Sequence, residues 1–503
     1  MPLPPAVAPL TRAEASDWNE TSRHADVLAF IDALASRKDS RLKVEDFGQS
    51  PEARRLPLLI LSAGGHFSPE AAEAAGLPVV LVINGIHAGE VEGKEASLML
   101  VRHLLDGGYG DLLDKLVLVV VPLFNPDGND RISPDNRKLD LAHFSGQLGP
   151  PGGVGTRVNA AGINLNRDYM AQQAQEMRLL QSRVVQRWNP HLTIDCHATN
   201  GSIHRFAMTY DVPHTVESGR REPIDYMRQR LLPTVAAAVK QVEGMDSFWY
   251  GNFLRDEGGQ GTGWITYTHH PRFGGNYRGL ANRLDLLLEA YSYIPLVERT
   301  RVTHAFLCES LRYVADHGQE IRELLAACTL PPERIAVRYR LEAFEGESVE
   351  ILTREPYTLE GEPVVARVPY LGRFVGEHVV ERPWAYAVPA DVAAHLQGHG
   401  LALEPEGVEG VYEVEVATVL AEVSSAGREI LEANASTWLE ATLNRERRSL
   451  PEGYRLVRTG QPRGAIAVYL CEAGSDDGIV ACGLIPRPAT GAEFPVWRVL
   501  GPA

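Results

Sequence analysis

Short apolar runs alternate with helical stretches over the middle of the chain. The runs have strand length and lie at residues 58–61, 78–83, 116–121, 192–196, 203–209 and 284–289. The stretches between them carry apolar residues at helical spacing, most clearly at 92–105, 171–188, 216–242 and 295–327. Near-continuous apolar strands separated by helices predict an α/β fold, in which a mixed, mostly parallel sheet has helices on both faces.

The same pattern divides the chain into three segments. Residues 1–55 begin with a proline-rich stretch and hold an amphipathic helix at 25–35, so we expect a lead that packs onto the next domain. Residues 56–330 carry the α/β pattern. After Pro331 and Pro332, residues 331–503 alternate β-branched and polar positions, for example at 335–340, 412–416 and 466–470, with one helix at 390–396. We therefore expect a β-rich accessory domain there.

Composition and charge narrow the range of partners. The 503 residues are 44% apolar and 23% charged, an ordinary balance for a globular protein. The formal net charge of -16 has the wrong sign for a surface that neutralises phosphates, so we expect no nucleic-acid partner. No run reaches the roughly 18 apolar residues of a membrane span, so we expect no membrane partner.

The cysteines and the N-terminal residues indicate the cellular compartment in which we expect the protein. The five cysteines are odd in number and scattered, without a CxxC pair, which favours reduced thiols over a disulfide framework. The start, Met1-Pro-Leu-Pro-Pro5, lacks a basic segment followed by an apolar stretch, so no secretory signal is predicted. The expectation is a cytoplasmic protein.

Candidate chemistry first appears between the strand at 78–83 and the helix at 92–105. The connecting turn contains Gly85-Ile-His-Ala-Gly-Glu90, which places His87 and Glu90 at the carboxyl edge of the sheet, where open α/β folds bind ligands. His-x-x-Glu alone is weak evidence, and a hydrogen-bonded loop histidine is the simpler alternative. The spacing recurs at His214/Glu217, His317/Glu320 and His378/Glu381.

A second strand adds the support that the first motif lacks. The run at 192–196 ends in His197, which is followed by a polar loop containing a glycine. Two imidazoles and one carboxylate form a three-ligand zinc set with an open fourth position, the arrangement of catalytic rather than structural zinc. The sequence therefore predicts a single zinc ion held by His87, Glu90 and His197.

Five motifs follow one another over residues 20–330. They are His87-x-x-Glu90, Asn125-Pro-Asp-Gly128, Asn164-Leu-Asn-Arg167, His197 after a strand, and Leu286-Leu-Leu-Glu-Ala290. In this order they resemble the zinc carboxypeptidase family, the carboxypeptidase A-like metallopeptidases. Since the disulfides and signal of the family's secreted members are missing, the chain resembles the bacterial-type, non-digestive branch.

The resemblance implies roles for individual residues. His87, Glu90 and His197 match the zinc ligands, and zinc in such a set activates water and polarises a carbonyl. Glu289, at the end of a buried strand, matches the general base and proton shuttle. Glu309 is a rival for that role, but it lies within the long helical pattern after residue 295 and is rejected.

The resemblance also implies substrate contacts. Asn166 and Arg167 match the pair that grips a substrate's terminal carboxylate, a task suited to the planar guanidinium. Arg137 is our choice for the arginine that stabilises the developing oxyanion, with Arg131 nearby as an alternative. Tyr267 is our choice for the family's mobile tyrosine by its separation from Glu289, and the competing candidate is Tyr277.

The segment 269–283 departs from the digestive enzymes because it is rich in arginine, histidine and glycine. Its arginines would favour an acidic substrate side chain if they faced the pocket, although charged loop residues are usually just solvated. The pair His269-His270 raises the question of a second metal. No carboxylate cluster accompanies it in the sequence, so a polar loop is the preferred interpretation. The arginines are Arg272, Arg278 and Arg283.

These observations favour a zinc metallocarboxypeptidase that hydrolyses a C-terminal peptide bond by metal-activated water, with a glutamate as general base. The expected substrate is a peptide or small amide with a free carboxylate. One alternative is a zinc deacylase of N-acyl amino acids, similar to aspartoacylase or succinylglutamate desuccinylase. Another is a non-catalytic zinc-binding interaction protein. Exposed sheet edges in residues 331–503 could shape substrate access or make a homo-oligomer contact.

Overall fold

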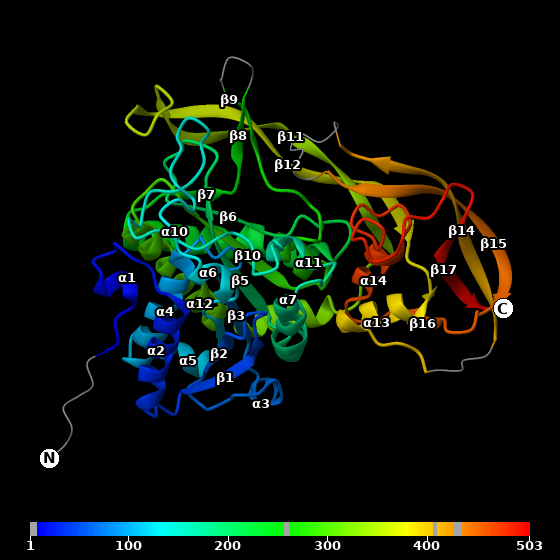
Figure 1. The fold of residues 1–503 in the computed structure, drawn as a ribbon, viewed down its shortest axis with the longest axis horizontal. Helices are drawn as coiled ribbons and strands as arrows, with labels where there is room; N and C mark the ends of the chain where they lie inside the picture. The colour runs from blue at the N-terminus through cyan, green and yellow to red at the C-terminus, as the bar shows by residue number, and fades with distance from the viewer. Residues whose placement is uncertain (1–7, 256–260, 406–409, 427–434) are drawn as a thin grey trace.

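A computed structural model describes residues 8–255, 261–405, 410–426 and 435–503 (Figure 1). Its central sheet has eight strands in the order β1-β2-β4-β3-β5-β10-β6-β7. Four of the seven pairings are parallel: β3 with β4, β3 with β5, β5 with β10, and β6 with β7. The strands are β1 (Leu42–Gln49), β2 (Arg55–Leu61), β3 (Val79–Asn84), β4 (Val117–Val121), β5 (Leu192–Thr199), β6 (Met208–Asp211), β7 (Ser247–Trp249) and β10 (Leu284–Tyr291).

Both faces of this sheet are buried, as the near-continuous apolar runs predict. Along β3, Val80 and Val82 join one hydrophobic cluster with helices α2, α4, α10 and α12, whereas Leu81 and Ile83 join a second cluster with α7, η2 and α11. Alternate side chains of a strand point to opposite faces, so each apolar run supplies two cores. The predicted mixed α/β sheet with helices on both faces is confirmed.

Each stretch predicted as helical is largely helical in the structure, which also contains short helices that were not predicted. The segments predicted as helices at 171–188 and 216–242 each contain a wider π-helical turn, η2 and η3. The helices are α1 (Arg12–Ala15), α2 (His24–Ser36), α3 (Pro69–Ala74), α4 (Glu92–Leu105), α5 (Leu112–Lys115), α6 (Pro126–Asp130), η1 (Leu165–Arg167), α7 (Gln175–Leu179), η2 (Leu180–Val185), α8 (Gln186–Trp188), α9 (Arg221–Tyr226), η3 (Met227–Leu231), α10 (Leu232–Glu243), α11 (Gly274–Leu280), α12 (Leu296–Ala327), α13 (Ala390–Gly398) and α14 (Gly464–Cys471).

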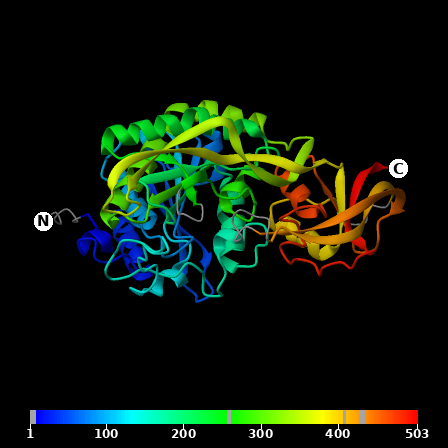
Figure 2. The same cartoon turned by 90° about the horizontal axis from the view of Figure 1, so that it is seen from above.

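Two further sheets include the strands after α12. The first has the order β11-β12-β9-β8 and the second the order β15-β14-β17-β13-β16. Seen from above, β11 and β12 pass over the central sheet and lead to the C-terminal strands (Figure 2). The strands are β8 (Asn252–Arg255), β9 (Gly261–Ile265), β11 (Arg334–Glu355), β12 (Glu362–Glu381), β13 (Ala385–Val388), β14 (Val411–Ser424), β15 (Thr437–Ser449), β16 (Arg455–Arg458) and β17 (Glu493–Pro502).

Three expectations differ from this architecture in detail. The segment 1–55 also contributes the edge strand β1 to the central sheet. The sheet of β8, β9, β11 and β12 crosses residue 330, where we expect a domain boundary. The strand pattern at 466–470 is wrong, because these residues lie in helix α14, which is buried on all sides and therefore lacks an amphipathic period.

Two further expectations from the sequence concern the state of the cysteines and membrane-spanning helices. All five cysteines are free thiols. Among the helices of the described residues, none combines the length and the apolar character that crossing a bilayer requires.

Candidate metal centre

Parallel pairing of β3 with β5 brings two predicted ligands to one edge of the central sheet. Asn84, the last residue of β3, lies beside Cys196, so the turn after β3 lies next to His197. His87 and Glu90 occupy that turn, just before α4. All three side chains are buried, and one ligand atom from each lies within 4.8 Å of the others.

The inner atoms of this cluster face one another. His197 Nδ1 lies 3.2 Å from His87 Nδ1 and 3.0 Å from Glu90 Oε2, while His87 Nδ1 lies 3.2 Å from Glu90 Oε1. The outer nitrogens also face oxygen atoms, through a hydrogen bond at His87 and through an ion-pair contact at His197. His87 Nε2 is 3.0 Å from Asn164 Oδ1, and His197 Nε2 is 3.1 Å from Asp195 Oδ1.

This arrangement fits a metal ion. An acceptor on the outer nitrogen of a histidine fixes the proton there and leaves the inner nitrogen as a lone pair. Two lone pairs and a carboxylate then converge on one point, an arrangement that repels unless a cation lies between them. Two imidazoles with one carboxylate are a ligand set that zinc accepts with a fourth position open.

The shifted pKa values of His197, His87 and Glu90 also indicate a site that favours positive charge. Burial opposes a charge on His197, yet Asp195 and Glu90 outweigh it and hold the pKa of His197 well above its usual value. Burial lowers the pKa of His87 to about 4, so this imidazole is neutral. Burial also opposes ionisation of Glu90, but His87 and Arg137 outweigh it and hold the pKa of Glu90 well below normal.

Glu289 lies beside the metal cluster on the neighbouring strand. It is half-buried near the end of β10, opposite His197 in the parallel pairing with β5. Burial and the nearby Glu90 raise the pKa of Glu289 to about 8, against the opposing effect of His197. The sequence rival Glu309 lies on α12, where it pairs with Arg312.

Arg137 contacts the cluster directly, whereas Arg131 does not. Arg137 Nη1 lies 2.9 Å from Glu90 Oε1, and its Nη2 donates to the carbonyl of Ala198 at 3.2 Å. Arg131 pairs with Glu52 at 2.7 Å, and both side chains are exposed.

A second arginine, Arg157, lies 3.2 Å from Glu90 Oε1. Sequence reasoning missed it, because it follows a glycine-rich loop in which an arginine resembles any solvated charge.

Asn166 and Arg167 lie in the short helix η1, which follows Asn164, the residue that contacts His87. Asn166 Oδ1 accepts from the backbone N–H of Gly274 at 2.9 Å, and the Arg167 guanidinium stacks 3.6 Å above the Phe273 ring. Within the described part of the chain, no carboxylate lies at ion-pair distance from Arg167. Burial and the neighbouring Arg157 lower the pKa of Arg167 to about 9, which marks a guanidinium that lacks an anion.

The two tyrosines named from the sequence make hydrogen bonds to other parts of the fold. The Tyr267 hydroxyl donates to the carbonyl of Val212 at 3.0 Å, and the Tyr277 hydroxyl bonds to His399 at 2.8 Å, so both are engaged within the fold. Tyr250, which follows β7, lies against the Tyr267 ring and is electrostatically coupled to Glu289. No sequence motif marks Tyr250, because the pairing of β7 with β6 places it there.

The arginines of residues 269–283 are engaged in ion pairs or buried. Arg278 is fully buried between Asp195 and Asp285, and Arg272 pairs with Asp477. Burial lowers the pKa of Arg283 to about 10. These contacts give no support to a preference for acidic side chains.

The interpretation of His269 and His270 as a plain polar loop is incomplete. Asp476, more than 200 residues later, lies beside both. The carboxylate that the local sequence lacks comes from the C-terminal part of the chain.

The fold and the site define a mixed α/β protein with a candidate centre of two histidines and one glutamate. The family model of the zinc carboxypeptidases matches residues 27–204 of this chain. The match includes His87, Glu90, Asn166, Arg167 and His197, and it ends before β10.

Relatives with assigned names are carboxypeptidases. Carboxypeptidase B of Astacus astacus is 30% identical over 123 residues, which are 24% of this chain and 38% of that protein. Carboxypeptidase 2 of Trichophyton tonsurans is 23% identical over 472 residues, which are 90% of this chain and 81% of that protein.

Similar solved structures include two bacterial enzymes. A metallo-carboxypeptidase from Burkholderia cenocepacia has 19% identity and a TM-score of 0.40, covering 58% of this chain and 68% of that one. A metallo-carboxypeptidase from Pseudomonas aeruginosa, in complex with (2-guanidinoethylmercapto)succinic acid, has 18% identity and a TM-score of 0.40, covering 58% and 69%.

Proposed function

We propose that this protein is a zinc metallocarboxypeptidase that removes a C-terminal residue from a peptide. The observation that carries the proposal is the convergence of His87, Glu90 and His197 at one sheet edge, with Glu289 opposite His197. A zinc ion in this set would activate a water molecule and polarise the substrate carbonyl. The ligand set leaves a position open for both tasks.

Glu289 is the proposed proton carrier. It accepts a proton from the attacking water and passes it to the leaving amine, so its carboxylate must both gain and release a proton during a turnover. Its half-buried position supports this role, because burial and Glu90 raise its pKa towards neutrality. Arg137 supplies positive charge where the oxyanion develops. Arg157, on the same side of Glu90, is proposed to assist it.

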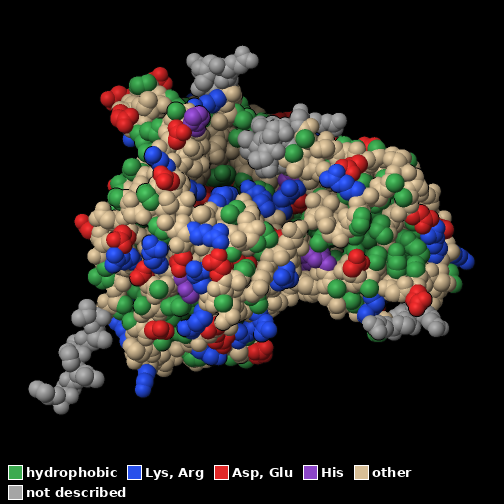
Figure 3. All heavy atoms as spheres, in the orientation of Figure 1, with side chains coloured by type: hydrophobic (Ala, Val, Ile, Leu, Met, Phe, Trp, Pro, Cys, Tyr) green, Lys and Arg blue, Asp and Glu red, His purple; other side chains and the backbone are tan. Residues whose placement is uncertain are grey.

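Arg167 is the proposed anchor for the substrate's terminal carboxylate. A partly buried guanidinium without an anionic partner is costly, and a bound carboxylate would supply the missing charge through a two-pronged contact. The Phe273 ring and the bond from Gly274 to Asn166 hold the anchor in place. Figure 3 shows Lys and Arg side chains gathered around a hollow on this face of the molecule, which suits an anionic substrate end.

The experiment compares three substrates on protein depleted of metal and then reloaded with Zn²⁺. The first is a blocked dipeptide with a free C-terminus, the second its C-terminal amide, and the third an N-acyl amino acid. We expect zinc-dependent hydrolysis of the first and a loss of at least about 100-fold in kcat/KM for the amide.

Three results would contradict the proposal. Faster hydrolysis of N-acyl amino acids would indicate a deacylase. Stoichiometric zinc without hydrolysis across a broad peptide panel would indicate a binding protein. Equal rates on the acid and the amide would remove Arg167 as the anchor.

A further inference from the structure

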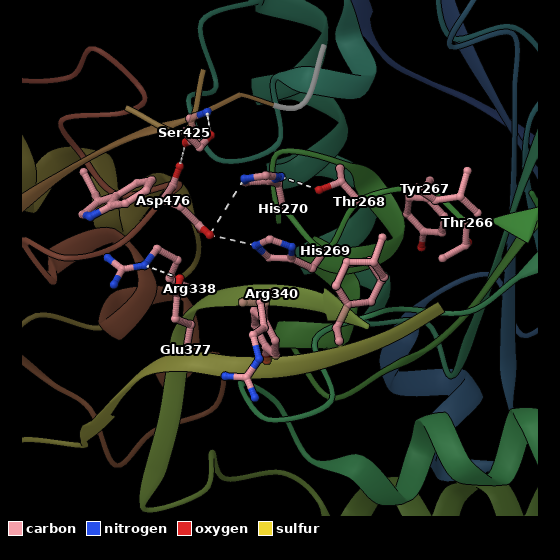
Figure 4. Close-up of a pocket in the computed structure, with 16 residues that line it drawn as sticks. Thr266, Tyr267, Thr268, His269, His270, Arg338, Arg340, Glu377, Ser425 and Asp476 are labelled. Carbon is pink, nitrogen blue, oxygen red and sulfur yellow. Dashed lines mark hydrogen bonds and ion pairs between the residues drawn. The ribbon is translucent and has the colours of Figure 1, made fainter. Parts of the chain in front are cut away.

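A second cluster of potential ligands joins distant parts of the chain. His269 and His270 lie in the loop between β9 and α11, and Asp476 lies in the segment after α14 (Figure 4). One ligand atom from each lies within 4.8 Å of the others, and all three side chains are buried. A cavity of about 360 Å³ adjoins the cluster and has all three residues in its wall.

The two imidazoles are directed at one carboxylate oxygen. His269 Nε2 lies 2.7 Å from Asp476 Oδ2, and His270 Nε2 lies 3.8 Å from the same atom. The second distance is too long for a hydrogen bond, so this nitrogen faces the carboxylate without bonding to it. The rings stack with their centroids 4.3 Å apart, which keeps both nitrogens on the same side (Figure 4).

Surrounding contacts orient two of the three side chains, as is usual for metal ligands. Thr268 Oγ1 holds His270 Nδ1 at 2.5 Å, so the Nε2 atom is the one that faces Asp476. The Tyr469 hydroxyl donates to Asp476 Oδ1 at 2.7 Å, which leaves Oδ2 for the histidines.

Charge around the cluster leaves Asp476 available to a cation. The arginines nearby have other partners, since Arg272 pairs with Asp477, Arg338 with Glu377 and Arg340 with Glu342.

We propose that His269, His270 and Asp476 form a second metal site, which holds a Zn²⁺ ion and ties the C-terminal region to the loop beside the candidate active site. Imidazole nitrogen and carboxylate oxygen are ligands that zinc accepts, and the cavity leaves room for water in the remaining position. This site is separate from the centre at His87 and does not depend on the proposed peptidase activity.

At this location the ion would link two parts of the chain that are distant in sequence. Phe273 lies in the same loop as the two histidines, separated from His270 only by Pro271 and Arg272, and Gly274 is the next residue. Phe273 contacts Arg167, and Gly274 donates a hydrogen bond to Asn166. A metal bridge from Asp476 would hold this loop against the C-terminal region. Its loss is therefore expected to loosen Arg167 and raise KM.

Zinc stoichiometry of the full chain tests the proposal. Metal-depleted protein is dialysed against Zn²⁺ and its metal content measured. We expect two ions in the wild type, one in His87→Asn, and none in the double variant His87→Asn/His270→Asn. Asparagine at position 270 retains a polar contact for Thr268 but removes the Nε2 ligand. A matched control is His143→Asn, which breaks an exposed His–Asp pair of the same 2.7 Å length and keeps both ions.

Two further measurements distinguish the loss of a metal ligand from the misfolding of a variant. In the His87→Asn background, which keeps the second cluster intact, adding Zn²⁺ should raise the melting temperature by about 2 °C or more. Asp476→Asn retains an oxygen for Tyr469 and should abolish that rise. Anomalous scattering at the zinc edge should place a peak between His269, His270 and Asp476.

Certain outcomes overturn the proposal. A wild type that binds one ion, lost entirely in His87→Asn, would show that the second cluster is an ordinary buried His–Asp pair. Retention of the second ion in both His270→Asn and Asp476→Asn would place it elsewhere. If the protein binds two ions but hydrolyses no peptide, the second site stands and only the proposed function fails.

Discussion

Glu289 lies directly opposite His197 in the parallel pairing of β5 and β10. Adjacent strands lie about 4.8 Å apart, so this register places a carboxylate next to a candidate metal ligand without making it one. It is absent from the three-residue ligand cluster. This separation of roles underlies the first prediction.

Glu289→Gln is expected to keep its zinc and lose nearly all activity. The amide has the size of the carboxylate but carries no proton between water and leaving group, so kcat should fall by about 10²- to 10⁴-fold. Zinc content and kcat are measured on the same sample. Glu309→Gln is the matched control, because Glu309 pairs with Arg312 on α12, and its activity should equal that of the wild type. A fully active Glu289→Gln protein would remove this residue from the mechanism.

Arg137→Ala is expected to lower kcat by about 10²- to 10³-fold, the usual effect of removing one group that stabilises an oxyanion. Arg137 also contacts Glu90 at 2.9 Å, so zinc content must be measured alongside. Arg131→Ala removes only an exposed pair with Glu52 and should leave kcat unchanged. Equal losses in the two variants would refute the assignment.

The two tyrosines should separate activity from stability. Tyr250 is coupled to Glu289 and Arg167, so Tyr250→Phe is expected to lower kcat/KM about tenfold with little change in melting temperature. Tyr267→Phe removes the donor to the Val212 carbonyl and should cost about 1 kcal/mol of unfolding free energy while kcat stays constant. The reverse pattern would restore Tyr267 as the substrate-binding residue.

Local patterns were sufficient to predict the central sheet and the metal cluster. Apolar runs mark the strands, and His87 and His197 each follow or end one, so the parallel pairing of β3 and β5 brings them together. To predict the metal cluster, it was enough to know that the ends of parallel strands meet at one edge of the sheet. The sequence also placed Glu289 at the end of a buried strand, whereas the position of that strand next to β5 comes from the structure.

Residues placed by long-range contacts escaped sequence analysis. Arg157 and Tyr250 lie in loops, and loop sequences have no repeating hydrophobic pattern that would predict where their side chains lie. Asp476 meets His269 only because the segment after α14 packs on the loop before α11. Helix α14 was mistaken for a strand, because a short apolar run that is buried on all sides lacks a diagnostic period.

Acid should destabilise the protein in part through His191. This histidine precedes β5, and its Nδ1 accepts a hydrogen bond from the Val79 backbone N–H at 3.0 Å. Burial, with Arg283 and Arg322 nearby, lowers the pKa of His191 to about 3 in the folded state. The unfolded chain takes up this proton near pH 6.5, about three pH units earlier. His191 therefore stabilises the fold fully above pH 6.5, and this contribution is lost as pH falls towards 3.

His191→Asn should flatten that dependence, because the asparagine Oδ1 can accept from Val79 but does not titrate. Between pH 6.5 and 4.5 the wild type should lose about 2 to 3 kcal/mol of unfolding free energy more than the variant. Urea unfolding at fixed pH steps measures the difference. His143→Asn, at an exposed position, should follow the wild-type curve. Parallel curves for wild type and His191→Asn would mean that this imidazole is already protonated in the folded protein, with its bond to Val79 broken.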